Sequence, residues 1–312
     1  MNVLSLFDGM SCGQIALERA GIKVANYYAS EIKPHAIKVT QHNYPRTIQL
    51  GDVRNVSTKD LPQIDLLIGG SPCQDFSQAN KEKLGLSGDK SSLFYEYLRI
   101  KNECKPKYWL LENVEMEDKE YATISELLGT YPVKINSELV SPQLRERVYW
   151  TNIGPEFYDL IGFRYCDIPE PKDKKMKFKD ILEYGYTERK KARCLLEGDS
   201  RPLATSVKMY YRHYVKGFTT LIFKSKKHYE DCEEYFNSNI KVLSADEIKC
   251  DSNVFDGVRY MTQNELEQCQ TVPKGYTSIV SRNEAASLLG DGWTIDVVTH
   301  ILQYINQWGG RI

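Results

Sequence analysis

Several features that would each narrow the class of protein are missing from this chain of 312 residues. No run of eighteen apolar residues occurs, so we expect no membrane span. The N-terminus has no early positive charge, and a signal peptide is therefore not expected. The eight cysteines form no C-x-x-C pair, which gives no support to a zinc or redox site and favours a reducing compartment. We therefore expect no bound metal and a cytoplasmic location.

A strong net charge is also missing, since the formal value is −1. The charge is unevenly spread, however, because residues 172–228 hold sixteen Lys or Arg against six Asp or Glu. A basic patch in a near-neutral protein favours a polyanion bound at one place. An ordinary solvated surface is the alternative that charge alone leaves open.

The first 153 residues alternate short apolar strands with helical patterns. Strands are predicted over 2–7, 23–31, 64–68 and 108–114, and helices over 13–21, 34–44 and 91–104. This alternation predicts an α/β fold with a doubly wound, mostly parallel sheet.

The pattern breaks near Gly154 into short strand-like pieces, polar linkers and basic clusters. Alternation in "HYVKGFTTLIF" (213–223) predicts β structure, so we expect a smaller, irregular, mostly β domain. Helical patterns return over 283–290 and 294–307, and the apolar terminal helix is expected to return to the first domain. The predicted division is a catalytic domain at 1–158, a second domain at 159–256 and a C-terminal return at 257–312.

Acidic residues close three of the apolar segments, at the sheet edge where such folds bind ligands. Asp8 lies in "FDGMSCG" (7–13), which has neither a G-x-G-x-x-G fingerprint nor a P-loop lysine and suits a cationic ligand better than a pyrophosphate. Glu31 could accept both hydroxyls of a ribose, and Asp52 could accept from an adenine amino group. Each acid alone is more often a helix cap or a surface charge. Together they favour a nucleoside with a cationic group.

Two further residues carry chemistry at strand ends. Cys73 follows a Gly-Gly-Ser-Pro turn, and a helix start or arginines nearby would favour its nucleophilic thiolate. A small buried thiol is the alternative, and the better bet for cysteines in general. Glu112 ends an apolar strand, where a desolvated carboxyl group suits a general acid. A helix cap or an arginine partner is the alternative for Glu112.

Five motifs in sequence order resemble those of the cytosine-5 methyltransferases, which use S-adenosylmethionine. They are "FDGMSCG", "GGSPCQDFS", "LLENV", "SPQLRERVYW" and "LLGDGWTIDVV", within 1–153 and 259–312. The resemblance implies a Rossmann-like class I methyltransferase sheet and methyl transfer to C5 of a cytosine flipped out of duplex DNA. The middle segment corresponds to the family's target-recognition domain by position alone.

The resemblance also implies a role for each matching residue. Cofactor contacts are expected from Phe7, Asp8, Gly9, Ser11, Cys12, Gly13, Glu31, Ile32, Asp52, Val53, Pro72, Asp291, Trp293 and Thr294. Asp291 stands where the family usually has Asn. Catalysis is expected from the nucleophile Cys73, the acid Glu112, and Arg145 and Arg147 beside the flipped base. The family's R-x-x-T-x-x-E stretch includes Arg259, an expected DNA contact. From the residues themselves, DNA contacts are expected from Gln74, Ser77 and Lys90 in a polar loop read as a lid after Cys73, and from Lys208 and Arg212, which alternate with tyrosines.

Three alternatives remain open at this stage. A tRNA cytosine-5 methyltransferase would use the same scaffold, although the long basic middle segment favours duplex DNA. A catalytically dead DNA-binding regulator is disfavoured by the intact Cys73, Glu112 and Arg147, and a nicotinamide dehydrogenase by the missing glycine fingerprint. For a DNA enzyme we expect a bacterial or phage-infected cell, with a cognate restriction endonuclease as a candidate partner. The sequence fixes neither the recognised bases nor the oligomeric state.

Overall fold

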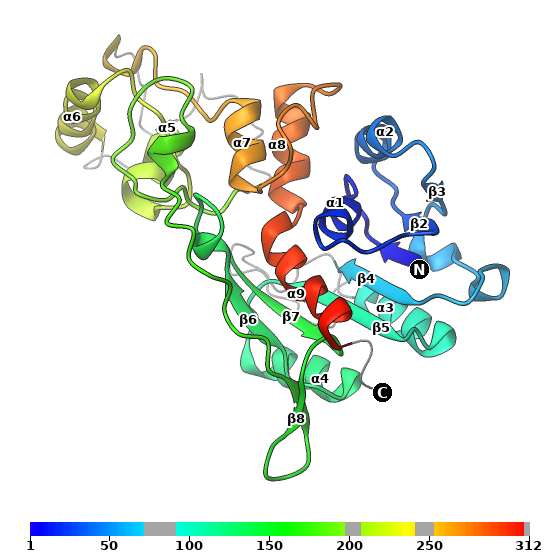
Figure 1. Cartoon of the computed structure of the whole chain (residues 1–312). Coiled ribbons are helices and arrows are strands. Elements are labelled where there is room, and N and C mark those ends of the chain that lie inside the picture. The colour runs from blue at the N-terminus through cyan, green and yellow to red at the C-terminus, as the bar shows by residue number, and fades with distance from the viewer. Residues whose placement is uncertain (72–91, 197–206, 241–252, 309–312) are drawn as a thin grey trace. The chain divides into compact units, whose positions relative to one another are not determined.

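The structure is a computed structural model that describes residues 1–71, 92–196, 207–240 and 253–308. The chain divides into two compact units (Figure 1). Unit 1 comprises 1–137, 146–172 and 295–312, and unit 2 comprises 138–145 and 173–294. The boundaries at 158 and 256 separate the predicted catalytic domain from the predicted second domain, and they stay predictions. Within the described ranges, no helix is both long enough and apolar enough to cross a membrane.

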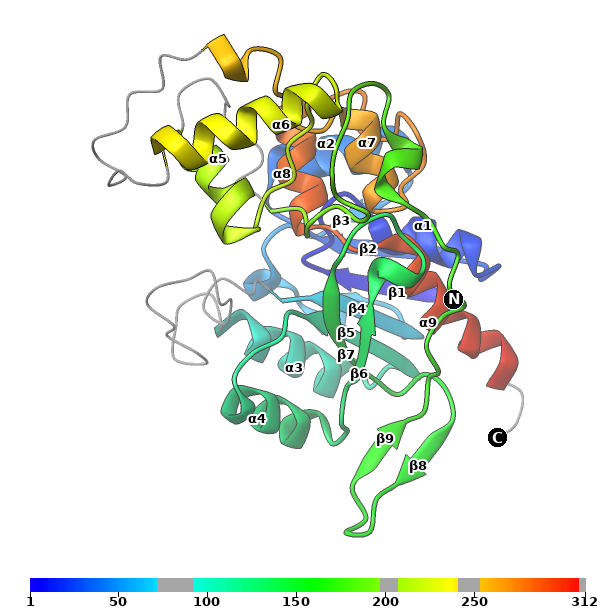
Figure 2. The same ribbon diagram turned by 90° about the vertical axis from the view of Figure 1, so that its left-hand side faces the viewer.

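Unit 1 is built on a mixed sheet, whose strands lie side by side in Figure 2. Seven strands of the described residues have the order β3-β2-β1-β4-β5-β7-β6. They are β1 (Asn2–Leu6), β2 (Asn26–Ser30), β3 (Ile48–Gln49), β4 (Leu66–Gly70), β5 (Tyr108–Asn113), β6 (Val133–Asn136) and β7 (Glu146–Thr151). The first five pair in parallel, whereas β7 runs antiparallel to both β5 and β6. A hairpin of β8 (Glu156–Tyr158) and β9 (Arg164–Cys166) forms a second, small sheet. The predicted α/β class is confirmed.

Unit 1 has five α-helices in its described residues, and all of them except α4 were predicted. They are α1 (Cys12–Arg19), α2 (Pro34–Asn43), α3 (Ser92–Cys104), α4 (Asp118–Leu128) and α9 (Ile295–Trp308). Pro34 opens α2 as expected, since the first turn needs no backbone N–H from that residue. The terminal helix α9 packs on α1, where Asp296 forms a 2.6 Å ion pair with Arg19.

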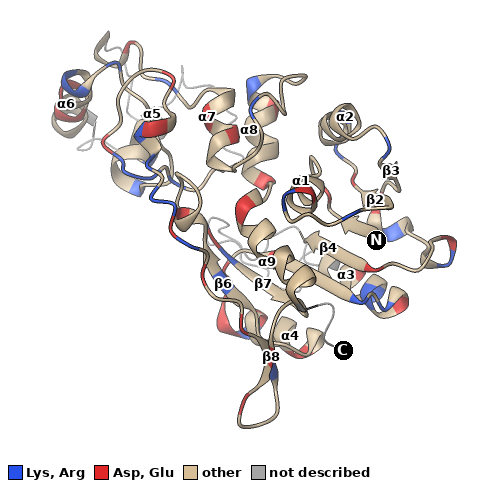
Figure 3. Cartoon of the chain, in the orientation of Figure 1, with Lys and Arg blue, Asp and Glu red and all other residues tan. Residues whose placement is uncertain are grey.

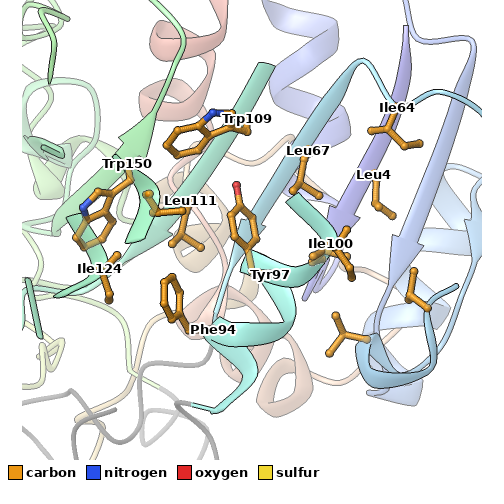
Figure 4. Packing of buried hydrophobic residues seen from close by; sticks show 14 of the residues in the cluster. Leu4, Ile64, Leu67, Phe94, Tyr97, Ile100, Trp109, Leu111, Ile124 and Trp150 are labelled. Atoms are coloured by element: carbon orange, nitrogen blue, oxygen red, sulfur yellow. The ribbon is translucent and has the colours of Figure 1, made fainter. Parts of the chain in front are cut away.

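Alternating residues of the central strands cover the two faces of this sheet. Leu67 joins a buried cluster with α3 and α4 residues such as Tyr97 and Ile124, seen in Figure 4. The next residue, Ile68, lies on the other face against α1. A Cβ on Gly13 would come within 2.4 Å of Ile68 Cδ1 and 2.7 Å of Tyr27 Oη, so a larger residue there would force these side chains to shift. Gly13 thus lies close to β4 and β2 at the start of α1.

Unit 2 is mainly helical in its described residues. Its helices are α5 (Val207–Tyr211), which continues as a π-helix (Arg212–Lys216), α6 (Lys226–Tyr235), which continues as a π-helix (Phe236–Ile240), α7 (Gln263–Cys269) and α8 (Arg282–Asp291). The expected mostly β structure of the middle segment is corrected, because apart from β9 its described residues hold helices and isolated bridges such as Tyr186 with Phe223. The sequence signal was ambiguous, since Tyr210 and Tyr214 are one helical turn apart. Both pack in an aromatic cluster with Phe223.

Candidate functional site

The loop between β1 and α1 has an unusual backbone. Phe7, Gly9 and Ser11 have φ angles of 57°, 60° and 61°, in the left-handed region. Two of the three are not glycine, and each such residue costs on the order of 1–3 kcal/mol unless its surroundings hold it in place. Strain of this kind is concentrated at ligand-binding loops, which agrees with the predicted role of 7–13.

Asp8 helps to keep the strained loop 7–13 in place. Its side chain is 8% exposed, and Tyr27 Oη donates a 2.7 Å hydrogen bond to Oδ1 while Ser11 Oγ donates to Oδ2. Burial raises the pKa of Asp8 to about 6. Both carboxylate oxygens are therefore engaged by the protein, and Asp8 ties the loop to β2. Its contact with a cationic ligand stays a prediction.

Glu31 follows β2 and joins the same loop from the neighbouring strand. Its Oε2 accepts from Gly9 N at 2.7 Å, and its Oε1 accepts from Ile32 N at 2.7 Å and Lys33 N at 2.9 Å. Two predicted cofactor residues, Gly9 and Glu31, are thus brought together. A carboxylate has roughly four acceptor sites, so one site of Glu31 is left for a further donor.

Asp52 follows β3 and has a strong local partner that the sequence did not predict. The Arg54 guanidinium donates to both Asp52 oxygens, at 2.5 Å from Nη2 and 3.0–3.1 Å from Nε. These bonds hold the pKa of Asp52 below its ordinary value. Val53, predicted to contact adenine, is 4% exposed and packs in the core cluster.

The end of β4 is anchored to β5. Asn113 Nδ2 donates to Ser71 Oγ at 3.1 Å, and both residues are buried. Ser71 lies two residues before the predicted nucleophile Cys73. The predicted residues Pro72, Cys73, Gln74, Ser77 and Lys90, and the lid, lie outside the described residues.

Glu112 and Arg147 meet across the junction of β5 and β7. Arg147 Nε lies 2.9 Å from Glu112 Oε1, and the two side chains are only 14% and 10% exposed. The antiparallel register places Glu112 opposite Tyr149, two residues along from Arg147. Two of the four predicted catalytic residues therefore form one buried ion pair.

Arg145 differs from Arg147 in that its guanidinium contacts residues of unit 2. It is 3% exposed, and its Nη2 donates to Gly292 O at 2.8 Å and Gly290 O at 3.2 Å. Its Nη1 contacts Cys194 Sγ at 3.2 Å and donates to Leu195 O at 3.3 Å. The guanidinium is thus engaged by the protein and holds the turn that carries Asp291.

Two glutamines that sequence reasoning missed support the same turn. Gln143 Nε2 donates to Gln270 Oε1 at 2.8 Å, and Gln270 Nε2 donates to Leu289 O at 2.6 Å. Thr294 Oγ1 also donates to Gln270 Oε1, at 2.8 Å. All three network side chains are buried. A buried amide must find partners for both its donor and its acceptor atoms, but the sequence does not show which glutamines are buried.

The remaining predicted residues are placed as follows. Ser11, Cys12 and Thr294 are buried, Trp293 is half-buried, and Ile32 and Asp291 are exposed. Arg259 pairs with the buried Glu265 at 2.7 Å and stacks on the Tyr184 ring, 3.9 Å from its centroid. Arg212 begins a π-helix and is half-buried, and Lys208 lies in α5. In the part of the chain that the structure describes, no group of three His, Cys, Asp or Glu is placed to hold a metal ion.

The fold belongs to a class seen in solved methyltransferases. The chain matches a methyltransferase of Entamoeba histolytica with a TM-score of 0.67 at 16% identity, over 98% of each chain. It matches the Dnmt2 methyltransferase of S. pombe with a TM-score of 0.66 at 18% identity, over 98% of this chain and 99% of that chain. At these identities the likeness establishes the fold.

Sequence similarity defines the family. Residues 1–307 match the model of the C-5 cytosine-specific DNA methylases, and the chain belongs to that family of DNA (cytosine-5) methyltransferases. It is 27% identical to the type II methyltransferase M1.ScrFI of Lactococcus lactis subsp. cremoris over 96% of this chain and 77% of the relative. It is 34% identical to the type II methyltransferase M.NgoBV of Neisseria gonorrhoeae, over 58% of this chain and 46% of the relative. The predicted family and enzyme class are confirmed.

Proposed function

We propose that this chain transfers a methyl group from S-adenosylmethionine to C5 of a cytosine flipped out of a short duplex DNA site. The observation that carries the proposal is the buried Glu112–Arg147 pair. It provides a carboxyl group and a cation at the end of β5, next in the sheet to the strand that leads to Cys73.

The residues at the strand ends fit a nucleoside with a sulfonium group. The strained loop 7–13 presents backbone close to the sheet edge, and Glu31 keeps a free acceptor site for a ribose hydroxyl. When bound, S-adenosylmethionine supplies an electrophilic methyl group. Asp52 would accept from adenine, in competition with Arg54. Further contacts are proposed from Ile32, Val53, Pro72, Asp291, Trp293 and Thr294.

The proposed chemistry begins with addition of the Cys73 thiolate to C6 of the cytosine. This addition makes C5 nucleophilic, and protonation or hydrogen bonding at N3 by Glu112 neutralises the charge that develops on the ring. Arg147 orients the Glu112 carboxyl group. After methyl transfer, the C5 proton leaves to a base or water and the thiolate is eliminated. The base must leave the duplex stack first, at a cost of a few kcal/mol.

The other predicted residues receive supporting roles. Arg145 is proposed as a positioning residue, since its guanidinium holds the turn at Gly290 and Gly292. Gln74, Ser77 and Lys90 are proposed to contact DNA near the nucleophile, and Lys208 and Arg212 to do so from the middle segment. Arg259 is the weakest DNA candidate, because Glu265 and Tyr184 already engage it.

Specificity is proposed to come from about 160–255, with a recognition site of roughly two to five base pairs. The relatives are bacterial and phage proteins, including an orphan methyltransferase of Bacillus phage SPR. We propose the cytoplasm of a bacterial or phage-infected cell as the location. A cognate restriction endonuclease is a candidate partner, because two relatives are named type II methyltransferases.

Trapping on modified DNA tests the proposal. Duplex DNA with 5-fluorocytosine at the target should give a covalent enzyme–DNA adduct in the presence of S-adenosylmethionine, because fluorine cannot leave as a proton does. Cys73→Ala should abolish both the adduct and turnover, with another cysteine variant, Cys104→Ala, as the control. An active Cys73→Ala protein would overturn the nucleophile assignment. Methyl transfer to tRNA but not to duplex DNA would favour the RNA alternative.

A further inference from the structure

Residues 173–180 of the basic middle segment, which we call the lysine strap, hold four lysines and two aspartates. Its sequence is "DKKMKFKD", and Lys174, Lys175, Lys177 and Lys179 are all exposed. Figure 3 shows blue residues along the chain between β9 and α5, where the strap lies. None of these lysines was among the predicted DNA contacts.

The strap is fixed to unit 2 rather than loosely attached. Phe178 is completely buried and Ile181 is 8% exposed, so one apolar anchor lies on each side of Lys179. Lys174 N donates to Leu139 O at 2.7 Å, and Phe178 N donates to Lys190 O at 2.8 Å. The second bond brings the exposed Lys190 beside the strap. A fixed backbone lowers the entropic cost of using these lysines in binding.

Four of these lysines keep their charged groups out of ion pairs in the described part of the chain. Among the described residues, Lys175, Lys177, Lys179 and Lys190 form no ion pair. The acids of the strap serve its backbone instead, since Asp173 Oδ1 accepts from Lys175 N and Asp180 Oδ2 accepts from Lys177 N. By contrast, Lys191 is turned inward and donates to the carbonyls of Glu138 and Ser141.

We propose that the lysine strap, with Lys190, contacts the phosphate backbone of the substrate DNA and supplies affinity that does not depend on sequence. This inference rests on the proposed function, and it separates phosphate contact from base reading within the middle segment. Lysine is a flexible point charge that suits phosphates, whereas base edges are usually read by bidentate groups. Four exposed cations on a fixed backbone fit a line of phosphates.

The salt dependence of binding tests the strap. In Lys175→Gln/Lys177→Gln, the slope of log affinity against log salt for a non-cognate duplex should flatten by roughly 1.8, or about 0.9 for each lost contact. The sites that receive 5-methylcytosine should not change, because phosphate contacts carry no sequence information. The unfolding midpoint should also stay the same.

The chain offers a matched control in the same basic stretch. Lys226 and Lys227 are 72% and 79% exposed, but they pair with Glu230 and Asp231 in α6. Lys226→Gln/Lys227→Gln removes the same charge and should leave the slope nearly unchanged. An unchanged slope in the strap variant, equal flattening in both variants, or an altered methylation site would overturn the inference. If the wild-type chain neither binds nor methylates duplex DNA, the proposed function fails, and the strap inference fails with it.

Discussion

Unit 1 and unit 2 position their candidate site residues by different means. In unit 1, Asp8, Glu31 and Glu112 lie at or near the ends of paired strands, and the strand order determines which of them are neighbours. In unit 2, Arg145 and Gln270 hold the turn at Gly290–Gly292 through side-chain bonds to carbonyl oxygens. A sheet edge tolerates changes of side chain, because backbone bonds keep the geometry. A turn held by side chains depends on each of them.

The largest effect is expected at Glu112, where a substitution should slow the chemical step while the chain still folds. Glu112→Gln should slow the chemical step by roughly 10²–10⁴-fold, because the amide cannot deliver a proton to N3. The change is isosteric and β5 keeps its ladder, but it leaves the buried Arg147 cation without its carboxylate, so some stability should be lost as well while the chain still folds. Single-turnover methyl transfer measures the loss. Glu115→Gln, on the half-exposed carboxylate that pairs with Lys134, is the control and should react normally. An unchanged rate in Glu112→Gln would reduce Glu112 to a structural role.

The converse is expected at Arg145, where a substitution should lower the free energy of unfolding more than it changes the chemistry. Arg145→Ala removes the arginine donor from the buried or partly buried carbonyls of Gly290, Gly292 and Leu195, and Gly292 O keeps only the 3.3 Å bond from Gln270. We expect a loss of about 4 kcal/mol in the free energy of unfolding, since each unsatisfied buried group costs about 1–3 kcal/mol. Urea unfolding measures it, and Arg145→Lys should recover part of the loss. A fully stable Arg145→Ala protein that is catalytically dead would show that Arg145 acts at the base instead.

This contrast explains how much could be predicted from the sequence. The strands and helices that form β1, α1, β2, α2 and β5 were predicted because each carries its own apolar period and end signals. The antiparallel β7, inserted between β5 and β6, was not predicted, because strand order depends on distant pairing. The motif containing Arg145 and Arg147 was found, but no local signal separates an arginine that faces Glu112 from one that holds carbonyl groups.

In the middle segment a local sequence pattern was present, but it predicted the wrong conformation. "HYVKGFTTLIF" alternates like a strand, yet His213 and Tyr214 lie in a π-helix. His213 is 2% exposed, and its Nδ1 accepts from Leu221 N at 3.2 Å. Burial lowers the pKa of His213 to about 3, so the ring stays neutral as part of the core. Aromatic packing decided the conformation, and the pattern of polar and apolar residues does not encode that packing.

A pH-dependent effect should appear in the loop of unit 1. The pKa of Asp8 is about 6 in the folded chain against 3.8 ordinarily, so folding favours the protonated form. The stability that Asp8 contributes is therefore complete below about pH 3.8 and is lost as the pH rises through about 6. Relative to Asp8→Asn, which does not titrate, the wild type should lose up to about 3 kcal/mol between about pH 4 and pH 7. Unfolding curves across this window measure the difference.

A second variant sharpens this test. Tyr27→Phe removes a hydrogen bond that favours the Asp8 carboxylate, so its window should move to higher pH. Parallel stability curves for the wild type and Asp8→Asn would contradict a titrating Asp8.

The smallest effect is expected at Asp291, the last residue of α8. It is exposed, and its negative charge lies at the negative end of the helix dipole. Asp291→Asn should therefore stabilise the chain by on the order of 0.3 kcal/mol. The control is Asp118→Asn in the first turn of α4, where the same change removes a favourable charge and should destabilise by a similar amount. Thermal unfolding measures both.

The turn stays in place because Arg145 and Gln270 hold its carbonyls, so Asp291→Asn should remain active and change affinity for S-adenosylhomocysteine and S-adenosylmethionine only modestly. Unchanged calorimetric titrations with both ligands would mean that Asp291 points away from the cofactor.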